Sequence, residues 1–213
     1  MKASISTVAC LLGLLLAALR PGPAAAEPFD YYVLALSWQP SWCAREGDER
    51  NAPSCRDGSA QGFKLHGLWP QHEDGWPEYC RTRQRDPARA ETAAMADIMG
   101  SPGLAWHQWK KHGRCSGLPA RDYFAASRAA YTAIRRPKAL RGLDRAVRID
   151  PDVVEEAFLE ANPDLDPAAV VVTCRERMIA EVRICLDRDL EPRPCSGPAA
   201  RACTRTATLP PLR

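Results

Sequence analysis

Two imidazoles, an ammonium group and a side-chain amide are concentrated in one short stretch of the chain. Residues 106–115 read WHQWKKHGRC and include two of only four histidines among 213 residues. At about 100° per residue, positions that are four apart lie one helical turn from each other. We therefore expect one face of a helix to present the candidate catalytic residues His107, Gln108, Lys111 and His112.

A third histidine, His66, lies upstream in the segment 63–71, which reads FKLHGLWPQ. Two imidazoles that face each other across a cleft act as general base and general acid near neutral pH. A cation beside them stabilises negative charge that develops on a phosphorane or a tetrahedral oxygen. RNA suits this metal-free chemistry, because its 2′-hydroxyl supplies the nucleophile within the substrate.

Other chemistries fit these residues less well. The Gly-x-Ser-x-Gly elbow of serine hydrolases is absent from the sequence. His107 and His112 lie about 140° apart around a helix, whereas the His-x-x-x-His pairs that bind zinc are one turn apart. Cys115 follows the histidines closely, but in an exported protein we expect it in a disulfide and not as a nucleophile. We predict no metal and no cofactor.

The first 26 residues are typical of a secretory signal peptide. Lys2 precedes an apolar run over residues 8–19, and three alanines at 24–26 form a small-residue cleavage site. The run is shorter than the ~20 residues that span a bilayer. We predict a signal peptide over residues 1–26, one mature domain over residues 27–213, and a secreted or periplasmic protein with no membrane attachment after cleavage.

Cysteine usage supports export. One of the nine cysteines, Cys10, lies in the predicted signal peptide. The mature chain then retains an even set: Cys43, Cys55, Cys80, Cys115, Cys174, Cys185, Cys195 and Cys203. In an oxidising compartment this set predicts four disulfides, with on the order of 100 possible connectivities. Zinc binding is the alternative, but no pair has the short Cys-x-x-Cys spacing.

Strands and helices follow one another without regular alternation, which predicts an α+β fold. The expected strands cover residues 31–38, 63–68, 169–173 and 178–186, and the last two form a β-hairpin. Helices are expected over residues 87–99, over the decapeptide, from Asp122, and after Asp150. We expect Gly113 to end the decapeptide helix in the left-handed conformation that glycine adopts without strain. We expect the tail from Thr204 to fray.

The net charge does not select a partner. The formal charge of +3 falls to +1 once Lys2 and Arg20 leave with the signal peptide. Any affinity for a polyanion must therefore come from a local basic groove. The arginines at 81, 83, 85 and 89 are interpreted as a solvated loop.

Two segments of the sequence resemble the active-site segments of the ribonuclease T2 family. They are FKLHGLWP at 63–70 and WHQWKKHGRC at 106–115, and their order and separation fit this family. SWQPSWC at 37–43 and the cysteine-bearing hairpin also match, so the resemblance to a bacterial member covers nearly the whole mature chain. It implies a twisted, mainly antiparallel sheet with surrounding helices. It also implies an endoribonuclease that cuts single-stranded RNA with low base specificity through a 2′,3′-cyclic phosphate.

The resemblance assigns a role to each matching residue. His112 would be the general base for the 2′-hydroxyl, and His66 the general acid for the leaving 5′-oxygen. Lys111 would stabilise the phosphorane, and His107 would bind the phosphate. The candidate substrate-binding residues are Trp69 as a base-stacking aromatic, Gln71 and Gln39. A monomer that needs no protein partner is expected.

The resemblance also implies a disulfide pairing. Cys80 would pair with Cys115, which ties one active-site segment to the rest of the chain. A nested arrangement would pair Cys174 with Cys203 and Cys185 with Cys195. Cys43 and Cys55 would then form the fourth bridge.

Gln108 departs from the family pattern, which has glutamate at this position. Glutamine keeps the size and a hydrogen-bond donor, but it cannot carry charge or transfer a proton. Without the carboxylate, the pKa values of neighbouring imidazoles should fall. We expect retained but reduced activity. The alternative is an RNA-binding relative that has lost catalysis.

Overall fold

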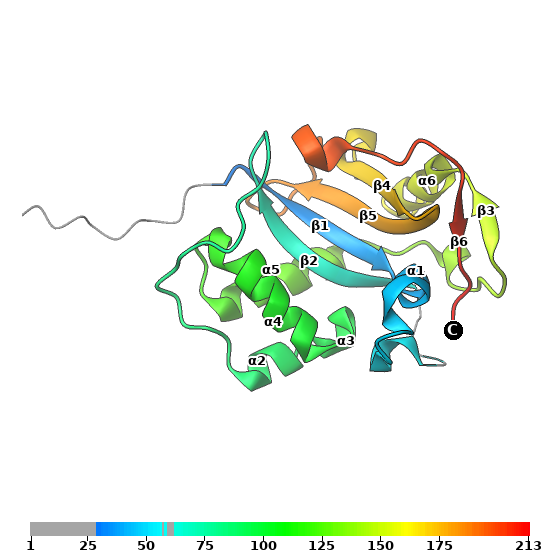
Figure 1. Ribbon diagram of the computed structural model, residues 1–213. Helices are drawn as coiled ribbons and strands as arrows, with labels where there is room; N and C mark the ends of the chain where they lie inside the picture. Colours follow the sequence, from blue (N-terminus) through cyan, green and yellow to red (C-terminus); the bar gives the residue numbers. More distant parts are fainter. Residues whose placement is uncertain (1–28, 57, 59–61) are drawn as a thin grey trace, which may run out of the picture.

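A strand that is almost wholly buried runs through the centre of the sheet. β1 (Tyr31–Trp38) is rich in β-forming residues, and all of it except Ser37 is buried. It pairs antiparallel with β2 (Phe63–Gln71) on one side and with β5 (Met178–Leu186) on the other. The computed structural model describes residues 29–56, 58 and 62–213 (Figure 1). The predicted signal peptide over residues 1–26 lies outside the described residues.

The sheet has six strands among the described residues, in the order β2-β1-β5-β6-β3, with β4 also paired to β5. β4 (Val170–Arg175) and β5 form the predicted hairpin. β3 (Val147–Ile149) pairs with β6 (Ala207–Leu209). Every pairing is antiparallel except that of β5 with β6. This arrangement confirms the predicted α+β class with a mainly antiparallel sheet.

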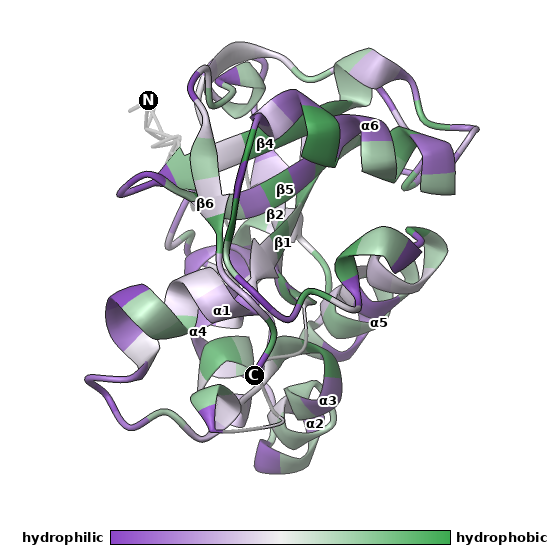
Figure 2. Ribbon diagram, turned by 90° about the vertical axis from the view of Figure 1, so that its right-hand side faces the viewer, coloured by the Kyte–Doolittle hydropathy of each residue, from purple (hydrophilic) through white to green (hydrophobic). Residues whose placement is uncertain are grey.

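The longer helices bury their apolar residues in one core with the sheet. α3 (Ala96–Met99), α4 (Pro102–Lys111) and α5 (Ala120–Ala133) contact β2, whereas α6 (Pro151–Ala161) packs against β4 (Figure 1). α5 carries both hydrophobic and hydrophilic residues (Figure 2), and its buried residues include Tyr123 and Phe124. Such an amphipathic helix is stabilised by burying its apolar side against the sheet.

The remaining helices are short. α1 (Gln39–Trp42) follows β1 directly, and α2 (Arg89–Ala93) precedes α3. Further single turns of 3₁₀ or π helix cover Cys43–Gly47, Pro53–Cys55, Gly113–Ser116, Lys138–Leu140, Pro167–Ala169 and Gly197–Ala200. No helix among the described residues is both long and apolar enough to cross a membrane.

The helix expected over residues 87–99 and the tail differ from their expected structure. The helix expected over residues 87–99 is divided into α2 and α3, and the turn between them places Met95 in the core. The tail after Thr204 is ordered, because β6 buries Ala207 and Leu209. The Trp38 indole N–H also donates a hydrogen bond to the carbonyl of Pro210, over 3.0 Å. These long-range contacts fix a segment that has little local structural preference.

The structure contains the four disulfides that the family resemblance implied: Cys43–Cys55, Cys80–Cys115, Cys174–Cys203 and Cys185–Cys195. Each such bridge typically stabilises a small domain by about 2–4 kcal/mol. Cys80–Cys115 joins the loop after β2 to the turn after α4. Cys185–Cys195 joins β5 to the segment that precedes Gly197–Ala200. Both bridges therefore hold loops close to the end of the sheet where the candidate catalytic residues lie.

Candidate active site

A β-bulge in β2 sets the direction of His66. Leu65 and Gly67 face consecutive residues of β1, which leaves His66 as the extra residue between them. Residues three apart on a regular strand point to opposite faces of a sheet. The bulge instead lets His66 and Trp69 share one face while Leu65 and Leu68 remain in the core.

This face of the sheet forms one wall of a cavity of about 250 Å³. Val33 of β1 and Arg183 of β5 line the cavity beside the residues of β2. The structure also brings together at this cavity all five predicted catalytic residues: His66, His107, Gln108, Lys111 and His112.

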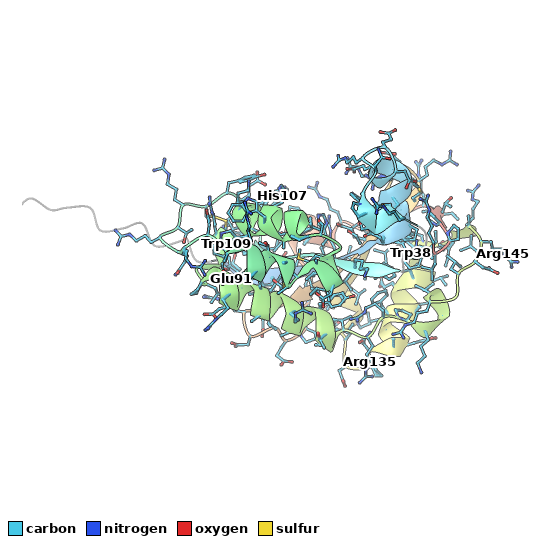
Figure 3. All side chains as sticks on the ribbon, turned by 90° about the horizontal axis from the view of Figure 1, so that it is seen from below. Trp38, Glu91, His107, Trp109, Arg135 and Arg145 are labelled. Atoms are coloured by element: carbon cyan, nitrogen blue, oxygen red, sulfur yellow. A yellow bond between two sulfur atoms is a disulfide. The ribbon has the colours of Figure 1, made fainter. Side chains whose placement is uncertain are left out.

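Four of these five residues come from α4 and its C-cap. The helix begins after Ser101, whose hydroxyl accepts a hydrogen bond from the backbone N–H of Leu104 (3.1 Å). On α4, Trp109 is fully buried, and its indole N–H donates to the Asp86 carboxylate (2.8 Å). His107 is exposed and lines the cavity (Figure 3). The buried side of α4 thus fixes the direction of the side that faces the cavity.

The expectation that Gly113 ends α4 in the left-handed conformation is wrong. Gly113 starts a 3₁₀ turn, and the left-handed residue is Gly117 (φ 77°). A glycine is needed at position 113 for a different reason, because a Cβ there would collide with the rings of Trp109 and Tyr123. The absence of a side chain allows the end of α4 to approach α5 closely.

Trp69, Gln108 and His112 form one packed unit. The Trp69 indole N–H donates to the side-chain oxygen of Gln108 (2.8 Å), and Gln108 is buried. The Trp69 ring stacks on the His112 ring, with centroids 5.2 Å apart and an interplanar angle of 25°. A Cβ at Gly67 would collide with both Gln108 and the Trp69 indole. Gln108 therefore holds Trp69, and Trp69 holds the imidazole of His112.

The environment of His112 favours its neutral form. Its ring is buried, and its Nδ1 has no hydrogen-bond partner among the described residues. Burial, together with the charges of Lys111, His66 and His107, lowers the pKa of His112 to about 3. His107 is only partly shielded from solvent, and this partial burial together with the charge of Lys111 also lowers its pKa. An imidazole that stays neutral is a proton acceptor.

His66 has a different partner. Its Nδ1 lies 2.5 Å from Oε1 of Glu181, a buried residue of β5. Burial raises the pKa of Glu181, but the hydrogen bond and charge of His66 and the charge of Arg183 outweigh it and bring the value to about 2. Glu181 is therefore ionised at neutral pH. The cavity thus holds two histidines in opposite electrostatic environments.

The loop after β2 completes the cavity. Trp76 lines it and is 49% exposed. Glu78 lies with its Oε2 3.5 Å from Nζ of Lys111, and the backbone N–H of Tyr79 donates to the carbonyl of Lys111 (2.8 Å). The Cys80–Cys115 bridge anchors this loop beside α4.

A wider groove of about 910 Å³ continues from the cavity and shares His66, Trp69 and His107 with it. Gln39 lines this groove, and its amide donates to the Ser54 hydroxyl (3.2 Å). Two acidic side chains line the groove, Glu46 and Glu181. Six basic side chains line it as well: Arg45, Arg50, Lys64, Arg175, Arg183 and Arg201. Gln71 instead lines the smaller cavity, and its amide donates to the Pro70 carbonyl.

The sequence reasoning did not identify Glu181, Arg183 or Trp76 as site residues. Glu181 and Arg183 alternate on a strand that was predicted correctly, which was a usable signal for their shared face. Nothing local in the sequence indicated that this face meets His66. Trp76 lies in the sequence Gly75-Trp76-Pro77, which is typical of a turn and gave no sign of a role at the site.

The model of the Ribonuclease T2 family matches residues 29–195. The chain belongs to the ribonuclease T2 family. This membership agrees with the resemblance carried by the two histidine-bearing segments, and both segments contribute to the same cavity.

Relatives from two bacteria are similar to this chain. A ribonuclease of Aeromonas hydrophila is 42% identical over 121 residues, which cover 54% of this chain and 53% of the relative. A probable ribonuclease of Haemophilus influenzae is 33% identical over 130 residues, which cover 54% and 47%. The matched part of the chain thus spans about half the length of these curated relatives.

A solved structure shows the fold. Trichomaglin, described as an S-like ribonuclease, superposes with a TM-score of 0.69 over 87% of this chain and 100% of its own, at 22% sequence identity. This likeness confirms the fold of the T2 family for the present chain.

Proposed function

We propose that the protein is an exported endoribonuclease that cleaves single-stranded RNA by metal-independent general acid–base catalysis. The observation that carries this proposal is the contrast between two histidines at one cavity. His112 is buried next to Lys111 and stays neutral, whereas His66 is hydrogen-bonded to the buried carboxylate of Glu181. One histidine is thus suited to accept a proton and the other to donate one.

In the proposed reaction, His112 removes the proton of the 2′-hydroxyl, and the 2′-oxygen forms a bond to the adjacent phosphorus. His66 gives a proton to the 5′-oxygen as the bond between phosphorus and this oxygen breaks. The products are a 2′,3′-cyclic phosphate and a 5′-hydroxyl. Lys111 and His107 bind the non-bridging oxygens, where negative charge accumulates in the phosphorane.

Two tryptophans support a weakly selective base site. Trp69 is held by Gln108 and stacks on His112, so the part of its ring left for a base is restricted. Trp76 is half exposed in the same cavity and offers the larger stacking surface. We infer that a base contacts both rings, with Gln71 nearby as a polar contact. Stacking of this kind is sequence-tolerant, because every base has a π-face.

The wider groove supports binding of the nucleotides after the cleaved bond. If His66 protonates the 5′-oxygen, the downstream nucleotide must lie on the His66 side, where this groove begins. Gln39 is placed to contact its base, and the excess of basic side chains suits a phosphate backbone. RNA of several nucleotides would therefore bind better than a dinucleotide.

Export and a monomeric state are part of the same proposal. The four disulfides are typical of an oxidising compartment, secreted or periplasmic. The proposed catalytic residues meet at one cavity within a single chain, so this site needs no residue from a second subunit, and we propose a monomer.

The direct test compares RNA with DNA of the same sequence. Purified protein in excess EDTA should cut single-stranded RNA and leave the DNA intact, because only RNA has the 2′-hydroxyl nucleophile. Binding of RNA without cleavage at any pH would favour the alternative, a relative that has lost catalysis with the family glutamate. Cleavage of both polymers would contradict the proposed chemistry.

Gln108→Glu should raise kcat/KM for RNA by roughly 3- to 10-fold. A carboxylate beside His112 and Lys111 favours the imidazolium form, which raises the depressed pKa of His112 and makes it a stronger base. The acidic limb of the pH profile should move to higher pH for the same reason. The Trp69 indole N–H keeps an acceptor in this variant.

The matched control is Gln84→Glu, which adds the same charge outside the cavity and should leave the pH profile unchanged. A Gln108→Glu variant that folds normally but is less active than the parent would show that the glutamine does not limit kcat/KM.

A further inference from the structure

Glu181 uses both of its carboxylate oxygens below the surface of the cavity. Oε1 lies 2.5 Å from Nδ1 of His66, and Oε2 accepts a hydrogen bond from Nε of Arg183 over 3.0 Å. The Nη2 atom of Arg183 also lies 2.9 Å from Oε2. A substrate phosphate gains nothing from a carboxylate, so the position of Glu181 behind His66 requires another explanation.

The sheet register explains how these residues meet. Glu181 lies opposite Ser37 of β1, and Arg183 lies opposite Ala35. Gly67, next to His66, faces Ala35 from the other side. Strands two places apart are roughly 10 Å from each other. The short side chain of Ala35 leaves room for the long side chains from β2 and β5 to join above β1.

The other titratable and charged groups that line the smaller cavity with His66 are bases. His107, Lys111 and His112 approach from α4, and Arg183 approaches from β5. None of the described residues that line the smaller cavity is acidic. Glu181 is therefore the carboxylate that contacts His66 directly, from behind the wall of this cavity.

We propose that Glu181 is a positioning residue for the general acid of this site. It keeps the proton on Nδ1 of His66, so that Nε2 faces the cavity and carries the proton that is transferred. Arg183 holds the carboxylate in place. This inference rests on the proposed ribonuclease function.

In this proposal Glu181 affects only the step in which the bond between phosphorus and the 5′-oxygen breaks. As the bond between phosphorus and the 5′-oxygen breaks, the proton moves from Nε2 to that oxygen, and Nδ1 keeps its hydrogen bond to Glu181. Attack of the 2′-oxygen, which depends on His112, does not involve Glu181. Loss of Glu181 should therefore lower kcat/KM only for substrates whose leaving group needs a proton.

Two uridine substrates separate these steps. Uridylyl-adenosine has an alkoxide leaving group that needs a proton, whereas uridine 3′-(4-nitrophenyl phosphate) has a phenolate that leaves without one. We expect Glu181→Gln to lower kcat/KM roughly 10- to 100-fold on the dinucleotide and to stay within about 3-fold of the parent on the aryl ester. Glu91→Gln is the matched control, since Glu91 is also bound by an arginine but lies on α2, away from the cavity.

A second experiment combines Glu181→Gln with His66→Ala. If Glu181 acts through His66, the double variant should be no slower on the dinucleotide than His66→Ala alone, because coupled residues are not additive. Equal losses on both substrates, or additive losses in the double variant, would overturn the proposal and leave Glu181 a structural ion pair. A parent enzyme that cleaves neither substrate would instead refute the proposed function.

Discussion

We expect His112→Ala to lower kcat/KM for single-stranded RNA by on the order of 10³-fold, through loss of the general base. His112 is the buried imidazole of the cavity, and its ring is fixed by stacking on Trp69. Water in the vacated space is a far weaker base than a positioned imidazole. The measurement is the initial rate of cleavage of a labelled RNA, with circular dichroism to confirm folding.

Because alanine removes a stacked ring, a second variant separates chemistry from packing. His112→Phe keeps an aromatic surface against Trp69 and should lose a similar amount of activity with a melting temperature near that of the parent. His72→Ala is the control, since His72 lies in the polar loop after β2 and its Nδ1 lies 3.8 Å from the Asp30 carboxylate. Cleavage by His112→Phe at the parental rate would eliminate His112 as the base.

The same assignment fixes the sign of the pH dependence. A general base must be unprotonated, and the pKa of His112 is lowered from 6.5 to about 3, chiefly by burial. The acidic limb of kcat/KM should therefore lie well below pH 6.5, and the enzyme should remain active in mild acid. An acidic limb centred at 6.5 or above would contradict this environment for His112.

Lys111→Met should lower kcat roughly 10²- to 10³-fold while KM changes much less. The ammonium group lies in the cavity and is held within 3.5 Å of the Glu78 carboxylate. Its effect is largest on the phosphorane, which carries more charge than the bound diester. A loss that falls mainly on kcat thus identifies stabilisation of the transition state.

Lys110→Met is the control for this variant. Lys110 precedes Lys111 on α4, but its Nζ lies over the Trp106 ring, 5.9 Å from the centroid. It should retain activity within about 2-fold, since it contributes only a distant charge. If Lys111→Met raised KM with kcat unchanged, Lys111 would bind substrate and transition state equally and would have no catalytic role.

Local patterns predicted most of the elements that position the site. The apolar run of β1, the alternation in β5 and the Asp150-Pro151 start of α6 were each visible in the sequence. The four disulfide pairs agree with the family resemblance, although spacing alone had left their connectivity open. All five candidate catalytic residues line one cavity, but their individual roles stay predictions.

Features that depend on long-range pairing were missed or wrong. Glu181 becomes a neighbour of His66 only because β1 lies between β2 and β5, and this strand order is not written in any local pattern. The bulge at His66 likewise appears only in the register with β1. The tail was expected to fray because its order depends on pairing with β3.

The central claim is that two histidines cleave RNA without a metal, and the ends of the products test it most directly. Single-stranded RNA is digested by the parent and by His112→Ala in excess EDTA, and the fragments are analysed by mass spectrometry. We predict 2′,3′-cyclic phosphate and 5′-hydroxyl ends that the parent forms and the variant does not. Fragments with 5′-phosphate ends, or cleavage that EDTA abolishes, would contradict the two-histidine mechanism.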